Sequence, residues 1–173
     1  MIAPRPTIAA AMVGAALLAA CGEATHFGSL DQAAEHYGID PAALTVVDDH
    51  RTVAAVAGEA GSVELWGFSR ESAGWTRSLR ATRQTEGEAY TVFLVTQPAG
   101  DVWAGSYAFG TAGADAARVT LDRTGEVGGA VRDGHWTIVG LAPAVAPAEL
   151  SWRFLGADGT PLRVGIGEVP PQP

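Results

Sequence analysis

The sequence has almost no cysteine: Cys21 is the only one in 173 residues. A single thiol cannot form an internal disulfide, so the apolar core must hold the fold without a covalent crosslink. Lysine is absent, and the 11 basic residues are all arginine, against 19 acidic residues, which gives a formal net charge of −8. Because an acidic body repels nucleic acids and anionic lipid headgroups, we expect neither as a partner.

Motifs for nucleophilic or nucleotide chemistry are also lacking. None of the seven serines lies in G-x-S-x-G, and neither G-x-G-x-x-G nor G-x-x-x-x-G-K-[ST] occurs. No two histidines have the H-x-x-x-H spacing of a zinc site. We therefore expect a non-enzymatic protein without catalytic, cofactor-binding or metal-binding residues. An enzyme whose site assembles from residues distant in sequence is the alternative.

Two acidic stretches keep other interpretations open. In an extended segment Asp48 and His50 share one side and could reach a metal, whereas the alternative is a solvated turn. Glu86 and Glu88 flank Gly87 and could serve acid–base chemistry on a glycan. Their polar surroundings instead favour a solvent-exposed loop without a catalytic role.

No apolar run is long enough for a confident membrane span. The segment from Ile8 to Ala20 has 13 residues without a charge, whereas a spanning helix needs about 20. It follows a free amino terminus and Arg5, and it ends in small residues. This layout is typical of a secretory signal peptide over residues 1–20.

The end of this run resembles the lipobox, the processing signal of bacterial lipoproteins. Its residues are Leu18, Ala19, Ala20 and Cys21. The resemblance implies cleavage before Cys21 and a diacylglycerol thioether on its sulfur, because a thiolate is the strongest nucleophile among the side chains. It also implies an anchor on the extracytoplasmic face of the cell membrane. The alternative is an ordinary signal peptide with an incidental cysteine.

A short tether, residues 21–28, precedes a predicted helical pair over residues 29–44. Ser29 and Gln32 form a capping box, and Gly38 supplies a left-handed helix end. Asp40 and Pro41 can start a second turn. The helix has one apolar face, made by Leu30, Ala33, Ala34 and Tyr37.

This pair is similar to the helical half of a LysM module, a peptidoglycan-binding unit. The matching positions are Leu30, Ala33, Ala34, Tyr37, Gly38, Ile39 and Leu44. The resemblance implies glycan contact through Tyr37 and Leu44. The sequence departs from the family at Asp48, where asparagine is favoured, and a lipidated Cys21 leaves little room for the first strand. A packed structural cap is the alternative.

From Thr45 onward the pattern predicts nine or ten short strands, and therefore an all-β antiparallel β-sandwich over residues 45–168. In the segment SVELWGF, Val63 and Leu65 take one face while Trp66 and Phe68 take the other. The segment AYTVFLVTQ is apolar on both faces, which predicts a central, buried strand. Residues 169–173 are expected to form a disordered tail.

The strand rhythm between Ala104 and Val164 is similar to that of immunoglobulin-like sandwiches in small secreted proteins of actinobacteria. The carrying segments are RVTLD, VRDGHW and LSWRFLGADGTPL. The resemblance implies an immunoglobulin-like body without an assigned activity.

Arg77, Arg80 and Arg83 form the one basic concentration, in the segment WTRSLRATR. On a regular strand Arg77 and Arg83 share a face, and Arg80 opposes them. They could bind a partner's carboxylates, or they could protect an edge strand from aggregation. Trp66 and Trp75 could face outward beside them and contact a protein or carbohydrate, whereas burial in the core is the alternative.

Together these patterns predict an exported, lipid-anchored protein with a non-catalytic body. We expect it to bind or support another envelope component, either a protein or peptidoglycan.

Overall fold

The computed structural model describes residues 25–122, 126–141 and 150–167, and within them it shows a mostly β fold of antiparallel sheets. Residues 1–20, Cys21 and the tail 169–173 lie outside these ranges. The elements run α1 (Leu30–His36), η1 (Pro41–Ala43), β1 (Thr45–Asp48), β2 (Arg51–Ala57), η2 (Glu59–Gly61), β3 (Ser62–Glu71), β4 (Gly74–Gln84), β5 (Phe93–Gln97), β6 (Gly105–Thr111), β7 (Arg118–Asp122), β8 (Glu126–Ala130), β9 (His135–Leu141), β10 (Ser151–Leu155) and β11 (Pro161–Ile166).

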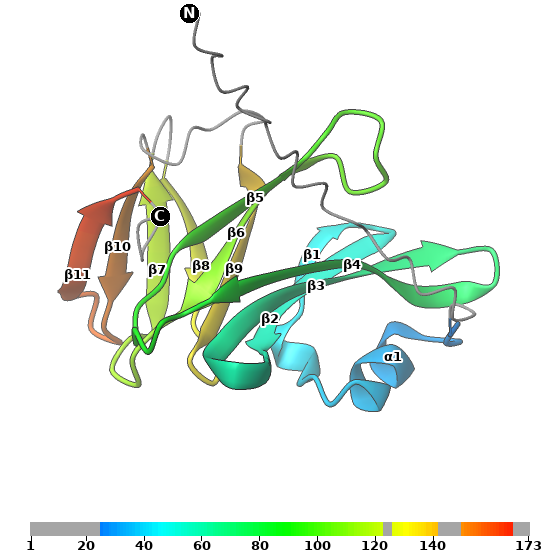
Figure 1. Cartoon of the computed structure of the whole chain (residues 1–173), viewed down its shortest axis with the longest axis horizontal. Helices are drawn as coiled ribbons and strands as arrows, with labels where there is room; N and C mark the ends of the chain where they lie inside the picture. The colour runs from blue at the N-terminus through cyan, green and yellow to red at the C-terminus, as the bar shows by residue number, and fades with distance from the viewer. Residues whose placement is uncertain (1–24, 123–125, 142–149, 168–173) are drawn as a thin grey trace, which may run out of the picture.

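The strands form three sheets, which lie one after another in Figure 1. The first sheet is a meander with the order β1-β2-β3-β4, and α1 covers its outer side. The middle sheet has the order β5-β6-β9, and the last sheet has the order β11-β10-β7-β8. The all-β, antiparallel prediction is therefore confirmed.

The middle sheet is apolar on both faces. Val92, just before β5, and Leu94 of β5 lie in a core shared with the last sheet, while Phe93 and Val95 lie in a core shared with the first sheet. Successive side chains of a strand alternate between faces, so a continuous apolar run must be covered on both sides. The segment AYTVFLVTQ is buried on both faces, as predicted, but β5 is an edge strand in the order β5-β6-β9, so the expectation of a central strand is wrong.

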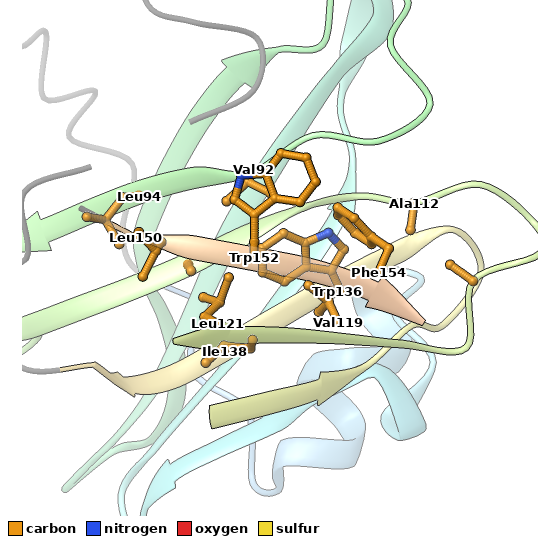
Figure 2. Packing of buried hydrophobic residues seen from close by; sticks show 12 residues of the cluster. Val92, Leu94, Ala112, Val119, Leu121, Trp136, Ile138, Leu150, Trp152 and Phe154 are labelled. Carbon is orange, nitrogen blue, oxygen red and sulfur yellow. The ribbon is translucent and has the colours of Figure 1, made fainter. Parts of the chain in front are cut away.

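Phe154 of β10 lies at the centre of the core between the middle and last sheets (Figure 2). The ring of Tyr90 lies edge-on to it at 5.1 Å between centroids, Trp152 at 5.6 Å and Trp136 at 6.0 Å. Such edge-to-face contacts align the positive ring edge with the negative ring face. The two tryptophans are almost fully buried.

The helix α1 forms where its capping residues predict it. The Ser29 hydroxyl accepts from the Gln32 N–H at 3.2 Å, and the Gln32 amide oxygen accepts from the Gly28 N–H at 3.1 Å. Gly38 ends the helix with a φ of +67°, and the Asp40 carboxylate caps η1. The apolar face of α1 packs on Ala54 and Phe68 of the first sheet, forming what we call the helix-side cluster.

The last residues of the expected tether belong to the fold. Phe27 and Trp75 exchange two backbone hydrogen bonds of 2.8 Å, which add one residue to the edge of β4. The Phe27 side chain packs on the helix-side cluster. In the described ranges no helix is long and apolar enough to cross a bilayer.

We predict that Gly67→Ala lowers the free energy of unfolding by about 1–3 kcal/mol, the usual cost of overpacking a core. A Cβ at Gly67 would lie 2.7 Å from the Trp103 ring and 2.7 Å from the Leu79 Cβ. Urea denaturation measures the change. Gly156→Ala is the control, since its new Cβ would lie 3.2 Å from the Asp158 carboxylate and no closer than 3.8 Å to any backbone atom. Equal losses in both variants would contradict this packing argument.

Candidate functional site

A β-bulge in β4 sets the positions of the three predicted arginines. Gly67 pairs with Leu79 but Phe68 pairs with Arg77, so Ser78 is an extra residue on β4. The bulge reverses the alternation beyond it. The expectation that Arg77 and Arg83 share a face is therefore wrong: Arg77 and Arg80 lie together on the helix side. Arg83 pairs with Val63, whose side chain faces the middle sheet.

Arg77 lies over two aromatic rings on the helix side. Its guanidinium carbon is 4.5 Å from the Trp66 ring centroid and 4.7 Å from that of Tyr37. The two rings meet edge to face at 5.4 Å. Among the described residues no carboxylate lies within ion-pair distance of Arg77. The positive charge of Arg77 therefore makes cation–π contacts with the rings of Trp66 and Tyr37. Its hydrogen-bond donors have no carboxylate partner among the described residues.

Arg80 is held differently, by the buried carboxylate of Glu64. Its Nε and Nη2 each donate to Glu64 at 2.7 Å, and the Trp66 Nε1 donates to the same carboxylate at 2.6 Å. Glu64 is 3% exposed, whereas the Arg80 side chain is 55% exposed. The hydrogen bonds from Arg80, and secondarily that from Trp66, lower the pKa of Glu64. Trp66 thus links the two arginines, because it carries Arg77 on its face and shares the Glu64 carboxylate with Arg80.

We call the group Tyr37, Glu64, Trp66, Arg77 and Arg80 the arginine patch. Four of its members come from the predicted partner-binding and glycan-binding residues, which the fold brings to one place. Glu64 carried no predicted role in the sequence. Its signal is a carboxylate set between the apolar residues Val63 and Leu65 of β3.

The other predicted binding residues surround the patch or lie apart from it. Trp75 is half-buried in the helix-side cluster beside Phe27, and Leu44 packs half-buried on the same cluster. Tyr37 is half-buried and also makes ring contacts with Phe27, His36 and Phe68. Arg83 lies on the opposite face of β4, where its Nη1 donates to the Thr82 carbonyl at 3.1 Å.

The acidic stretches form turns and loops. The Asp48 carboxylate accepts from the Arg51 Nε at 2.7 Å and from the His50 N–H at 2.9 Å. The bond from Arg51 is the main reason why the pKa of Asp48 is lowered. Glu86 and Glu88 are exposed. Within the part of the chain that the structure describes, no three His, Cys, Asp or Glu residues are placed to hold a metal ion.

The arginine patch is suited to binding. It offers the planar guanidinium of Arg77, the half-exposed guanidinium of Arg80, and parts of two aromatic rings. These groups match a partner that presents carboxylates and apolar groups. No family model, no curated protein and no solved structure matches this chain.

We predict that Arg80→Ala lowers the free energy of unfolding at neutral pH by about 2 kcal/mol, because it leaves the buried Glu64 carboxylate with Trp66 alone. Since the folded-state pKa of Glu64 is lowered, its stabilising effect is present above the ordinary glutamate pKa and is lost as the pH falls through the lowered value. Urea denaturation between neutral and acidic pH measures both effects.

The controls are Arg70→Ala, an exposed arginine of β3, and Glu64→Gln. The first should change stability by less than about 0.5 kcal/mol. The second should lose less stability than the wild type on acidification. An Arg80→Ala protein as stable as the wild type would contradict the described pair.

Proposed function

We propose that this chain is a lipid-anchored lipoprotein of the bacterial cell envelope, whose non-catalytic body binds or supports another envelope component through the arginine patch. The observation that carries the binding role is Arg77, a guanidinium lying over two rings without a carboxylate partner in the described residues. A cation in this state can accept a partner's carboxylate without breaking an internal ion pair.

The anchor in this proposal is a lipid on Cys21. Its support is the position of the one cysteine, directly after the apolar run and the lipobox-like residues. Each buried methylene contributes roughly 0.8 kcal/mol, so one acyl chain holds marginally while two or three hold durably.

The proposed anchor would place the arginine patch near the membrane. Only five residues lie between Cys21 and Phe27, so the two residues are at most about 22 Å apart. Phe27 is bonded to Trp75, and its ring lies 5.9 Å from that of Tyr37. The partner would therefore be a component that reaches close to the bilayer surface.

The proposed partner is a protein that presents acidic side chains next to apolar ones. The carboxylates would pair with Arg77 and with the exposed part of Arg80, and the apolar groups would cover Trp66 and Tyr37. The acidic remainder of the body would repel such a partner elsewhere, which favours this one orientation.

We also infer that strands β5–β11 form an immunoglobulin-like sandwich. Their order supports this: the first, second and fifth of the seven strands make one sheet, and the third, sixth and seventh lie in the other. The fourth strand, β8, pairs with β7. Sandwiches of this kind often serve as binding modules in extracellular proteins, which agrees with the proposed role.

Peptidoglycan contact through the helical pair is a second candidate. It is favoured by Tyr37 and Trp66, two partly exposed aromatic rings that lie next to each other beside the helix. Aromatic rings commonly bind the apolar faces of sugars.

We predict that the native protein carries a covalent lipid at Cys21. Intact-mass measurement of the protein purified from its own cells should give the mass of the chain from Cys21 onward plus a diacylglycerol. The Cys21→Ala variant should lack this addition, because alanine offers no sulfur. An unmodified thiol in the natural protein would refute the anchor.

We predict that Arg77→Gln weakens binding of the lipid-free body, residues 22–173, to isolated envelopes by about tenfold. Arg70→Gln is the matched control and should bind as the wild type does. Co-sedimentation at several salt concentrations measures the affinity. Equal binding by both variants would remove the arginine patch from the proposal. Retention on protein-free peptidoglycan that is lost with Tyr37→Ala and Leu44→Ala would favour the second candidate.

A further inference from the structure

A groove of about 390 Å³ lies on another part of the molecule, between the first sheet and strands β8 and β9. One wall comes from η1, β1 and β2, and the other comes from β8 and β9. A smaller pocket of about 150 Å³ adjoins it and shares Ala43, Ala55, Arg132 and His135 with it. No residue of the arginine patch lines either space.

Three sheet edges meet at this groove. Strands β1, β8 and β9 are each the last strand of their sheets, and within the described ranges no further strand pairs with their outer edges. The edge of a sheet carries backbone N–H and C=O groups that an extended peptide can pair with.

The walls of the groove are built from small residues. These are Ala42, Ala43, Ala55, Gly128, Gly129 and Ala130. Gly129 lets β8 approach β9 closely, because a Cβ there would lie 2.7 Å from the Thr137 carbonyl oxygen. These small residues let a peptide backbone come close to the strand edges, and the volume of about 390 Å³ leaves little space for large side chains.

One buried polar group that lines the groove has no hydrogen-bond partner among the described residues. Thr137 lines it, is 5% exposed, and has a buried hydroxyl without a hydrogen-bond partner in the described residues. By strand alternation this side chain points away from Trp136 and Ile138, toward β1 and β2. Buried hydroxyls are normally hydrogen-bonded, so an unpaired one at a groove indicates a missing partner.

Arg132 is the cation of the groove. It is exposed, and among the described residues no carboxylate lies within ion-pair distance of it. Its backbone is fixed by two hydrogen bonds of 2.8 Å with His135, which close a tight turn. Asp40 and Asp133 line the adjoining pocket, so a ligand with a second carboxylate would be repelled there.

We propose that this groove binds a short extended peptide with small side chains and a free C-terminal carboxylate. The peptide backbone pairs with an open strand edge, the carboxylate pairs with Arg132, and the Thr137 hydroxyl bonds to the peptide. This site is separate from the arginine patch and does not depend on the lipid anchor.

The test uses the dipeptide alanyl-alanine and its C-terminal amide as probes, titrated into the ¹⁵N-labelled protein. We expect the dipeptide to shift the amide resonances of Gly128, Gly129 and Thr137. Its affinity should fall by about tenfold or more when the C-terminus is an amide or when the protein carries Arg132→Gln. Arg70→Gln and Arg77→Gln should leave the titration unchanged.

Thr137→Val separates binding from stability. It removes a buried hydroxyl that has no partner, so the thermal midpoint should stay equal or rise. The dipeptide should nevertheless bind more weakly.

Absence of shifts at millimolar dipeptide, or equal affinity for the amide, would overturn the proposal. The amide comparison uses the wild-type protein and holds even where a variant fails to fold. If the dipeptide does not bind the groove, the expected loss of envelope binding in Arg77→Gln still stands, so the two proposals are tested separately.

Discussion

The fold depends on burying both faces of the middle sheet. Val92 and Leu94 require cover on one side, and Phe93 and Val95 require it on the other, so one sheet alone cannot complete the core. The last sheet closes the first side around Phe154, and the first sheet closes the second side with Val63 and Leu65. Because the first sheet also has apolar residues on its outer face, it needs a further layer, and α1 supplies it. The order of the layers therefore follows from the need to cover each apolar face in turn.

The arginine patch lies where that last layer stops. The helix α1 has only seven residues, and beside it Arg77 lies on the rings of Trp66 and Tyr37. The two arginines of β4 thus have different roles. Arg80 neutralises the buried Glu64 carboxylate, and Arg77 covers the surface of two aromatic rings. The first contributes to folding, because Glu64 could not be buried as an anion without it. The second has no such internal carboxylate among the described residues, which is why the proposed binding role rests on it.

Local patterns in the sequence predicted local structure well. Ser29, Gly38 and Asp40 form the caps that they indicate, and the alternation around Leu65 and Phe93 gives the right faces, because capping and strand alternation depend on near neighbours. The bulge at Ser78 could not be read in this way, because it is defined by the pairing of β4 with β3. The layering of three sheets, the ion pair between Glu64 and Arg80, and the groove at three strand edges also depend on residues distant in sequence. The lipid on Cys21 and the roles in the envelope remain predictions.

The pairing of Phe27 with Trp75 has a mechanical consequence. Phe27 joins the edge of β4 through two backbone hydrogen bonds and the packing of its ring on the helix-side cluster. A force applied along the chain that precedes Phe27 therefore acts first on these bonds, before it reaches the long ladder between β3 and β4. Their rupture would free Phe27 from the edge of β4 while the sheets stay folded, so the reach of the proposed anchor would increase under tension.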